Sequence, residues 1–209
     1  GIPIVDLMTG MYTAVAVLAA LANREQTGQG DYIDLAMLDV QTAVLSNQAM
    51  NHLLSGKTPK RGGNAHPNIQ PQDVYSCQDG DVILAVGNDR QFVKLCEALK
   101  RPELASDERF SVNAQRARNV AELTALLQDE FARWSRADLV AALSAAGVPC
   151  GPINSIPEVF QEPQVQHRRM LRTLPHPAGV AVPQVVCPIN FTNQPLQFES
   201  PPPLLGQHT

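Results

Sequence analysis

The sequence has few charged residues and no long block of one charge sign. Lysine, arginine, aspartate and glutamate make up 17% of its 209 residues, and the formal net charge is −4. The basic residues cluster no further than pairs such as Lys60–Arg61 and Arg168–Arg169. Because nucleic acid binding requires clustered cations that neutralise phosphates, we expect no nucleic acid partner.

Long hydrophobic runs are also missing. A transmembrane helix needs about 20 predominantly apolar residues, whereas the longest uninterrupted apolar run here covers residues 14–22. No secretory signal is visible in the residues given. We therefore expect no membrane span and a cytoplasmic location.

Cysteine and histidine are too sparse and scattered for a metal centre or a disulfide scaffold, which both need clustered side chains. The cysteines lie far apart, at Cys77, Cys96, Cys150 and Cys187. The histidines are dispersed in the same way, at His52, His66, His167, His176 and His208. The sequence predicts four buried free thiols and no bound metal.

What the sequence does contain is a single carboxylate at the start of a long apolar segment. Residues 11–21 are almost all apolar, and Asp6 precedes them. A helix that is apolar on most faces is a buried one, so we predict a buried helix over 7–25. Asp6 is then either a helix N-cap, a role that Thr9 could equally fill, or a chemical group held in a low-dielectric site.

The residues after this helix predict part of a layered α/β domain. The glycines of 27–30 end the helix and turn the chain. An apolar run over 32–38 is typical of a covered strand, and Asp39 is a candidate N-cap for a helix over 40–54. Helix, strand and helix make half of a doubly wound, Rossmann-like layer. Because residue 1 is a glycine inside this pattern, we expect the C-terminal part of a longer protein.

A loop over 57–72, with prolines and a Gly-Gly pair, is the candidate domain boundary. Beyond it, apolar runs at 74–77 and 82–86 flank Gln-Asp-Gly-Asp and predict a hairpin. Helices are predicted next, over 90–99, 114–134 and 136–146, the last capped by Ser135 and ended by Gly147.

The final part of the chain is rich in proline, which disfavours long helices. A strand is predicted over 148–153, a short helix over 156–171 and an extended return over 172–198. The charged residues around Arg116 look like a solvated ion-pair surface, in which each pair contributes little to stability.

We therefore expect an α/β protein in three parts. Residues 1–58 belong to a large doubly wound domain, residues 59–155 form a small α+β domain with its preceding linker, and residues 156–209 return to the large domain.

Several stretches, taken in order, resemble the family III CoA-transferases. This family contains formyl-CoA transferase, the carnitine CoA-transferases and α-methylacyl-CoA racemase. The matching stretches cover the chain from end to end: 6–21, 27–39, 66–71, 79–92, 113–119, 147–153 and 203–209.

The resemblance implies that Asp6 is a nucleophile. It would attack an acyl-CoA thioester, and the protein would then carry an aspartyl-CoA thioester until an acceptor carboxylic acid reverses the sequence. Acyl-CoA and a carboxylic acid are the implied substrates, with no permanently bound cofactor. Two alternatives stay open: a 2-methylacyl-CoA racemase or epimerase, in which the same acid moves an α-proton, and an inactive fragment of either enzyme.

The resemblance also implies an intertwined homodimer and a mobile glycine loop that shields the intermediates. Gly62 and Gly63 occupy the loop position, although a flexible linker between domains would need the same residues. His66 could touch substrate or could support the loop. The residues given are expected to be inactive by themselves, because most CoA-contacting residues of the family lie upstream of the Asp6 position.

Overall fold

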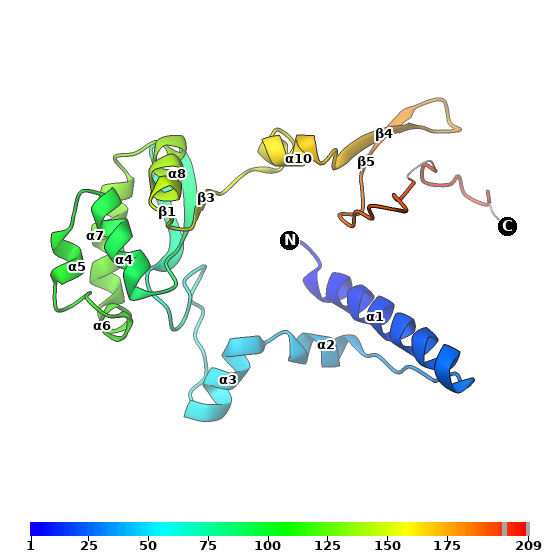
Figure 1. The fold of residues 1–209 in the computed structure, drawn as a ribbon, viewed down its shortest axis with the longest axis horizontal. Coiled ribbons are helices and arrows are strands. Elements are labelled where there is room, and N and C mark those ends of the chain that lie inside the picture. Colours follow the sequence, from blue (N-terminus) through cyan, green and yellow to red (C-terminus); the bar gives the residue numbers. More distant parts are fainter. Residues whose placement is uncertain (198–199, 208–209) are drawn as a thin grey trace. The chain divides into compact units, whose positions relative to one another are not determined.

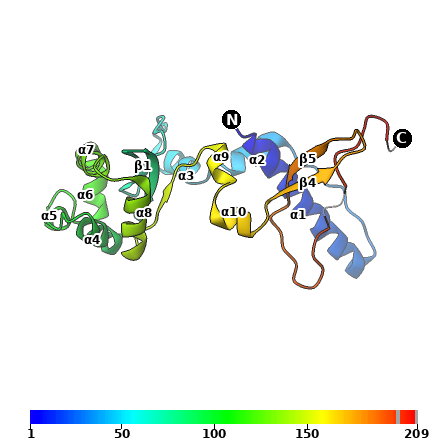
Figure 2. The same cartoon turned by 90° about the horizontal axis from the view of Figure 1, so that it is seen from above.

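The computed structural model describes residues 1–197 and 200–207, and the chain forms two compact units (Figure 1, Figure 2). The N-terminal unit is Gly1–Gly62 and the C-terminal unit is Gly63–Thr209. The division between them falls inside the predicted loop 57–72. Residue 198, the last of the predicted extended return, and His208 lie outside the described residues.

The N-terminal unit consists of helices joined by irregular segments. Its helices are α1 (Ile4–Thr27), α2 (Met37–Ala43) and α3 (Ser46–Ser55). Two of them end as predicted, at glycines in the left-handed conformation, with φ 72° at Gly28 and 69° at Gly56. The amide of Gly28 donates to the carbonyl of Arg24 at 2.8 Å, which closes the last turn of α1.

Two predictions for this unit are wrong. No strand forms over 32–38, because a strand needs a neighbour to pair its N–H and C=O groups, and residues 1–62, all of them described, contain no strand. The predicted helix over 40–54 is two helices, and Ser46 has φ 50° at the break. Asp39 lies in the first turn of α2, where Ala36 is the N-cap.

The prediction of a buried first helix is also wrong, since α1 has no buried residue. Ile4, Leu7, Met11, Val15 and Leu18 are between 55% and 66% exposed, and only Val40 is buried in the whole unit. Within residues 1–62, α1 packs against α2. The rest of this unit leaves the apolar side chains of α1 exposed.

Among the described residues, α1 is long and apolar enough to cross a membrane, with a mean hydropathy of 1.8 over its 18-residue window. The length of the uninterrupted apolar run did not predict a helix of this kind, because glycine, threonine and tyrosine interrupt the run. Core helices of soluble proteins satisfy the same length and composition test.

The C-terminal unit is built on a three-stranded antiparallel sheet in the order β1 (Gln72–Cys77), β2 (Gly80–Ala85) and β3 (Cys150–Pro152). Cys77 pairs with Gly80, so the predicted hairpin is confirmed, with two residues in its turn. Helices gather on this sheet in both ribbon views (Figure 2). They are α4 (Asp89–Ala98), α5 (Glu103–Ser106), α6 (Asn113–Arg118), α7 (Val120–Phe131) and α8 (Arg136–Ala145).

Local signals placed α4 and α8 correctly. Ser135 caps α8 by accepting from the amide of Asp138 at 3.1 Å, and Gly147, with φ 70°, follows its end. Helix α4 begins one residue before its predicted start, after Asn88, whose side chain accepts from the amide of Gln91. The predicted helix over 114–134 is two helices, α6 and α7, which meet at residue 119.

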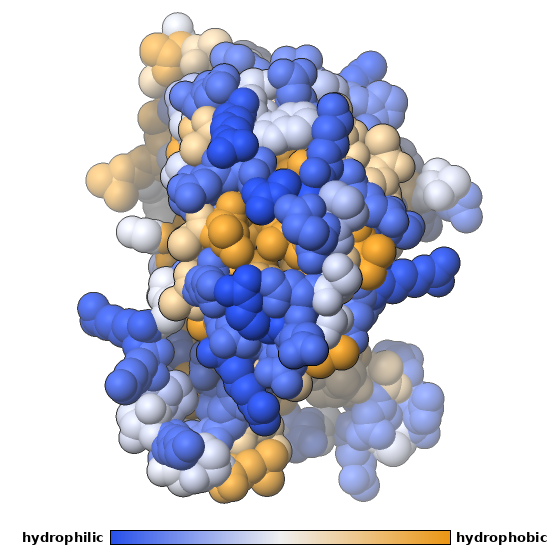
Figure 3. Space-filling view, turned by 90° about the vertical axis from the view of Figure 1, so that its left-hand side faces the viewer, coloured by the Kyte–Doolittle hydropathy of each residue, from blue (hydrophilic) through white to orange (hydrophobic). Residues whose placement is uncertain are grey.

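One hydrophobic core holds together the part of the C-terminal unit that runs from β1 to β3, and no described residue after 152 is buried. The Tyr75 and Phe131 rings meet edge to face at its centre, with centroids 5.0 Å apart. The face of the unit that carries α5 is mostly hydrophilic, with small apolar areas (Figure 3). The fully buried apolar side chains come from both the sheet and the helices: Val82, Leu84, Val86, Phe92, Leu95, Cys96, Phe110, Leu127, Phe131, Leu139 and Leu143.

The chain after β3 forms two short helices and a second hairpin. These are α9 (Ile156–Val159), α10 (Pro163–His167), β4 (Leu171–Pro175) and the antiparallel β5 (Ala181–Val185). The predicted single helix over 156–171 is therefore two helices, and the extended return contains a hairpin.

Arg136 ties the start of this segment to the sheet. Its guanidinium donates to the carbonyl of Ile153 at 3.2 Å and to the carboxylate of Glu158 at 2.8 Å. The side chain passes over Gly80, where a Cβ would lie 3.0 Å from the Nε of Arg136. Gly80 also has φ 138°, so both the space and the backbone at this turn favour glycine.

The pH dependence of Glu158 tests this contact. Hydrogen bonds from Arg136, and then from Ser155, lower the pKa of Glu158 to about 2. A carboxyl whose pKa is depressed in the folded state stabilises that state above its unfolded pKa of about 4.3, and this contribution is lost as the pH falls towards 2. In an NMR titration we expect Glu158 to titrate near pH 2 in the wild type and closer to 4 in Arg136→Gln. Equal midpoints in both proteins would contradict the contact.

The four cysteines are free, but they are not all buried as predicted. Cys96 is buried, Cys77 and Cys150 are half-buried, and Cys187 is exposed. Burial raises the pKa of Cys96 to about 12 and that of Cys150 to about 11.

Thiol reactivity should follow this order, because the thiolate is the reactive form. In the native chain at pH 8 we expect iodoacetamide to modify Cys187 first and Cys96 only in urea. Peptide mass spectrometry over time measures the order, and Cys187→Ser should remove the fast phase. Native labelling of Cys96 at the rate of Cys187 would show that the core is open.

Candidate active site

Asp6 lies in the first turn of α1, but it does not cap the helix. The N-cap residue is Pro3, and no side chain caps this end. Thr9 is not a cap either, since its hydroxyl donates to the carbonyl of Val5 at 2.7 Å. The N-cap interpretation is therefore wrong for both residues, and no local structural role accounts for the carboxylate.

Asp6 has apolar neighbours. The side chain is exposed, and Ile4 and Leu7 beside it are exposed as well. No other side chain carries a formal charge before Arg24. Asp6 is therefore a lone anion on an apolar surface, the setting in which exclusion of water would make a carboxylate reactive.

Gly62 and Gly63 lie on either side of the division between the two units. Both are exposed, and residues 57–64 are exposed and irregular. Gly63 has φ 62°, and a Cβ there would meet nothing within 4 Å. Backbone conformation, and not space, therefore favours glycine at this position.

His66, in the C-terminal unit, organises the turn that follows it. Its Nδ1 accepts from the amides of Asn68 at 3.1 Å and Ile69 at 3.0 Å. The amide of His66 donates to the carbonyl of Gln72 at 2.9 Å. An Nδ1 that accepts hydrogen bonds carries no hydrogen, so this geometry assigns the ring hydrogen to Nε2. His66 therefore supports the loop and still presents a donor.

The loop over 66–72, which we call the anchor loop, is held from within and by α6. The side-chain amide of Gln70, a buried residue, donates to the carbonyl of His66 at 2.7 Å. Asn113 accepts from the amide of Gln70 at 3.0 Å and donates to the carbonyl of Asn68 at 2.9 Å. Side chains thus satisfy backbone groups that no sheet pairs.

Arg116 completes this arrangement from inside the core, with a side chain that is 0% exposed. Its Nε donates to the carbonyl of Gln70 at 2.7 Å and its Nη1 to that of Phe110 at 2.8 Å. Its Nη2 donates to the carboxylate of Asp89 at 2.7 Å. The guanidinium also lies over the ring of Phe92, 4.5 Å from the centroid.

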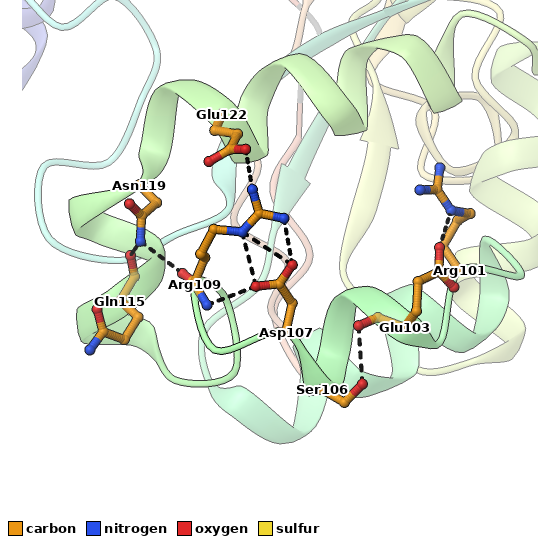
Figure 4. Close-up of polar contacts among 8 residues, drawn as sticks. All are labelled: Arg101, Glu103, Ser106, Asp107, Arg109, Gln115, Asn119 and Glu122. Atoms are coloured by element: carbon orange, nitrogen blue, oxygen red, sulfur yellow. Dashed lines mark hydrogen bonds and ion pairs between the residues drawn. The ribbon is translucent and has the colours of Figure 1, made fainter.

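The prediction of a solvated ion-pair surface is therefore wrong for Arg116 and confirmed for Asp107 and Arg109. The guanidinium of Arg109 lies between the carboxylates of Asp107 and Glu122 at the surface (Figure 4). Hydrogen bonds from Arg109 lower the pKa of Asp107 to about 2. No signal in the neighbouring sequence separates the two arginines, because Gln70 and Asp89 lie 46 and 27 residues from Arg116.

Among residues 1–197 and 200–207, no group of three or more histidine, cysteine or acidic side chains is arranged to hold a metal ion. Of the predicted site residues, the structure places Asp6 and Gly62 in the N-terminal unit. Gly63 and His66 belong to the C-terminal unit.

Sequence comparison decides the family. The family model described as CoA-transferase family III matches residues 1–209. The chain belongs to this family. The predicted family membership is thereby confirmed.

Named relatives extend this assignment. The succinate–glutarate CoA-transferase of Agrobacterium fabrum is 45% identical over 208 residues, which are 100% of this chain and 52% of that protein. The succinyl-CoA:glutarate CoA-transferase of Homo sapiens is 36% identical over 211 residues, covering 100% of this chain and 48% of that protein. The chain thus spans about half the length of the curated relatives it matches.

Solved structures confirm the predicted family fold. A CAIB/BAIF family protein from Brucella suis matches with a TM-score of 0.78 and 47% identity, over 100% of this chain and 54% of that one. A structure from Mycobacterium tuberculosis matches with a TM-score of 0.83 and 29% identity, over 99% of this chain and 55% of that one. The mixed α/β architecture is the one these structures share.

The buried guanidinium gives a stability prediction. In Arg116→Met the carbonyls of Gln70 and Phe110 lose their donor inside the core, so we expect a loss of about 3 kcal/mol in the free energy of unfolding. Urea unfolding followed by the fluorescence of Trp134, the single tryptophan, which packs against the core, measures this change.

Arg118→Met is the matched control, because Arg118 is exposed on the same helix. Its effect should stay within about 0.5 kcal/mol. Equal losses in the two variants would show that the buried network does not stabilise the unit.

Proposed function

We propose that the protein transfers coenzyme A from an acyl-CoA to a carboxylic acid, with Asp6 as the nucleophile. The observation that carries this proposal is the isolation of Asp6: it is the one charged side chain among residues 2–23, and it caps nothing. Membership of CoA-transferase family III supports the reaction class. The relatives named for CoA transfer between acids support it further.

The chemistry needs no external oxidant or metal. A carboxylate oxygen of Asp6 attacks the thioester carbonyl, the C–S bond breaks, and CoA leaves as a thiolate, so that a mixed anhydride remains. The thiolate then attacks the Asp6 carbonyl and the donor acid leaves as a carboxylate, which produces an aspartyl-CoA thioester. An acceptor carboxylate reverses both steps. Covalent catalysis of this kind divides one difficult exchange into two easier ones.

The proposed acceptor is a short dicarboxylic acid. Relatives are named for succinate and glutarate, for mesaconate and for oxalate, all of which carry two carboxylates. We further propose that Gly62, Gly63 and His66 belong to a loop that keeps water from the anhydride and the thioester. A homodimer is part of the same proposal, and light scattering of the full-length protein measures it.

The experiment is intact-mass spectrometry of the full-length protein incubated with succinyl-CoA, with and without hydroxylamine. We expect the wild type to gain the mass of one CoA less one water, and hydroxylamine to remove it. Asp6→Asn should gain nothing, and transfer from succinyl-CoA to glutarate should fall on the order of 10⁴-fold or more.

Asp39→Asn is the matched control, since Asp39 is an exposed carboxylate in the first turn of another helix of the same unit. It should form the adduct like the wild type. An adduct on Asp6→Asn would remove Asp6 from the nucleophile role. No adduct on any protein, together with solvent deuterium entering the α-carbon of a 2-methylacyl-CoA, would replace transfer by racemisation.

A further inference from the structure

We propose that Asn113 and Arg116 are positioning residues for CoA transfer. They fix the anchor loop, and its displacement lets water compete with the acceptor acid for the covalent intermediate. This inference rests on the proposed function. Asn113 and Arg116 support a loop that the proposed function assigns to the exclusion of water.

The chain changes character at His66. Residues 57–64 are exposed and irregular, and Gly63 adopts a left-handed conformation with open space around it. From His66 to Gln72 the backbone is instead held by side chains, and Gln70 is buried. An exposed, irregular segment over 57–64 thus joins a segment held by side-chain hydrogen bonds, so the anchor loop fixes the C-terminal end of 57–64.

The burial of Arg116 points to a positional task. Removing a guanidinium from water is costly, and apolar side chains that replace a whole buried ion pair often preserve stability. The planar guanidinium, however, reaches three separate segments at once: the carbonyls of Gln70 and Phe110 and the carboxylate of Asp89. A fixed fork of donors specifies one arrangement of these segments, which apolar packing would leave adjustable.

Asn113 works through the same carboxylate. Its backbone amide donates to the Oδ1 of Asp89 at 2.9 Å, and the same oxygen accepts from Arg116. Its side chain makes the two hydrogen bonds to the anchor loop. Because Asn113 is half-buried and outside the hydrophobic core, its replacement should release the loop without unfolding the unit.

Asn119 offers a matched control at the end of the same helix. Its side-chain amide makes two hydrogen bonds to backbone carbonyls, those of Arg109 at 3.1 Å and Gln115 at 3.0 Å, and none to the anchor loop (Figure 4). Asn119→Ala therefore removes two side-chain hydrogen bonds to backbone groups, as Asn113→Ala does, although Asn119 donates both and Asn113 donates one and accepts one.

The experiment compares full-length wild type, Asn113→Ala, Asn113→Asp and Asn119→Ala with succinyl-CoA and glutarate. Folding is first verified by Trp134 fluorescence, and then kcat and KM for transfer and the rate of acyl-CoA hydrolysis are measured. For Asn113→Ala we expect kcat to fall about 10- to 100-fold with little change in KM, because small displacements act on the reaction more than on binding. The ratio of hydrolysis to transfer should rise about tenfold.

Asn113→Asp keeps the oxygen that accepts from Gln70 and loses the donor to Asn68, so its ratio should lie between those of the wild type and Asn113→Ala. Asn119→Ala should keep the wild-type ratio even if it is equally destabilised. A merely structural role for Asn113 would lower stability in both alanine variants and change the ratio in neither.

Two failures can be told apart. If the wild type forms the covalent adduct and all folded variants share one ratio of hydrolysis to transfer, the positioning role is wrong and the proposed function stands. If the wild type forms no adduct and transfers no CoA, both proposals are wrong.

Discussion

The buried guanidinium of Arg116 is the constraint on which the rest of the C-terminal unit depends. It joins α4, α6 and the anchor loop, which are far apart in the sequence and share no strand pairing. Hydrogen bonds from the guanidinium to the carbonyls of Gln70 and Phe110 and to the carboxylate of Asp89 hold these segments at defined distances. The hydrophobic core beneath them supplies the driving force for folding, but burial of apolar area has no direction. The direction comes from the polar contacts.

The two units differ in how many of their apolar side chains they bury. The C-terminal unit has a closed core and a mostly hydrophilic face in the view of Figure 3. The N-terminal unit buries only Val40, while α1 exposes a stripe of large apolar side chains. Monomeric soluble proteins rarely expose large apolar side chains in a contiguous row. The lone carboxylate of Asp6 lies at the N-terminal end of this stripe, next to Ile4 and Leu7.

Features that depend on neighbouring residues could be predicted from the sequence. The helix ends at Gly28 and Gly56, the hairpin turn and the Ser135 cap each follow from a few adjacent residues. Features that depend on distant partners could not. The strand over 32–38 had nothing to pair with, and the apolar helix had nothing to cover it. The burial of Arg116 depends on residues up to 46 positions away, and no local pattern contains them. The role proposed for Asp6 rests on resemblance and stays a prediction, while the local interpretation of it as a cap was wrong.

The space over Gly80 has a mechanical consequence. Because no side chain stands there, Arg136 reaches across the hairpin turn to the backbone of Ile153 and to Glu158. The strand that leaves the sheet, β3, is three residues long and would peel away easily under tension. Through its contact with Glu158, Arg136 attaches the chain at a residue that follows this strand. A pull on the chain after α9 would therefore be borne by helix α8 and the hairpin turn, and the short strand would carry little load.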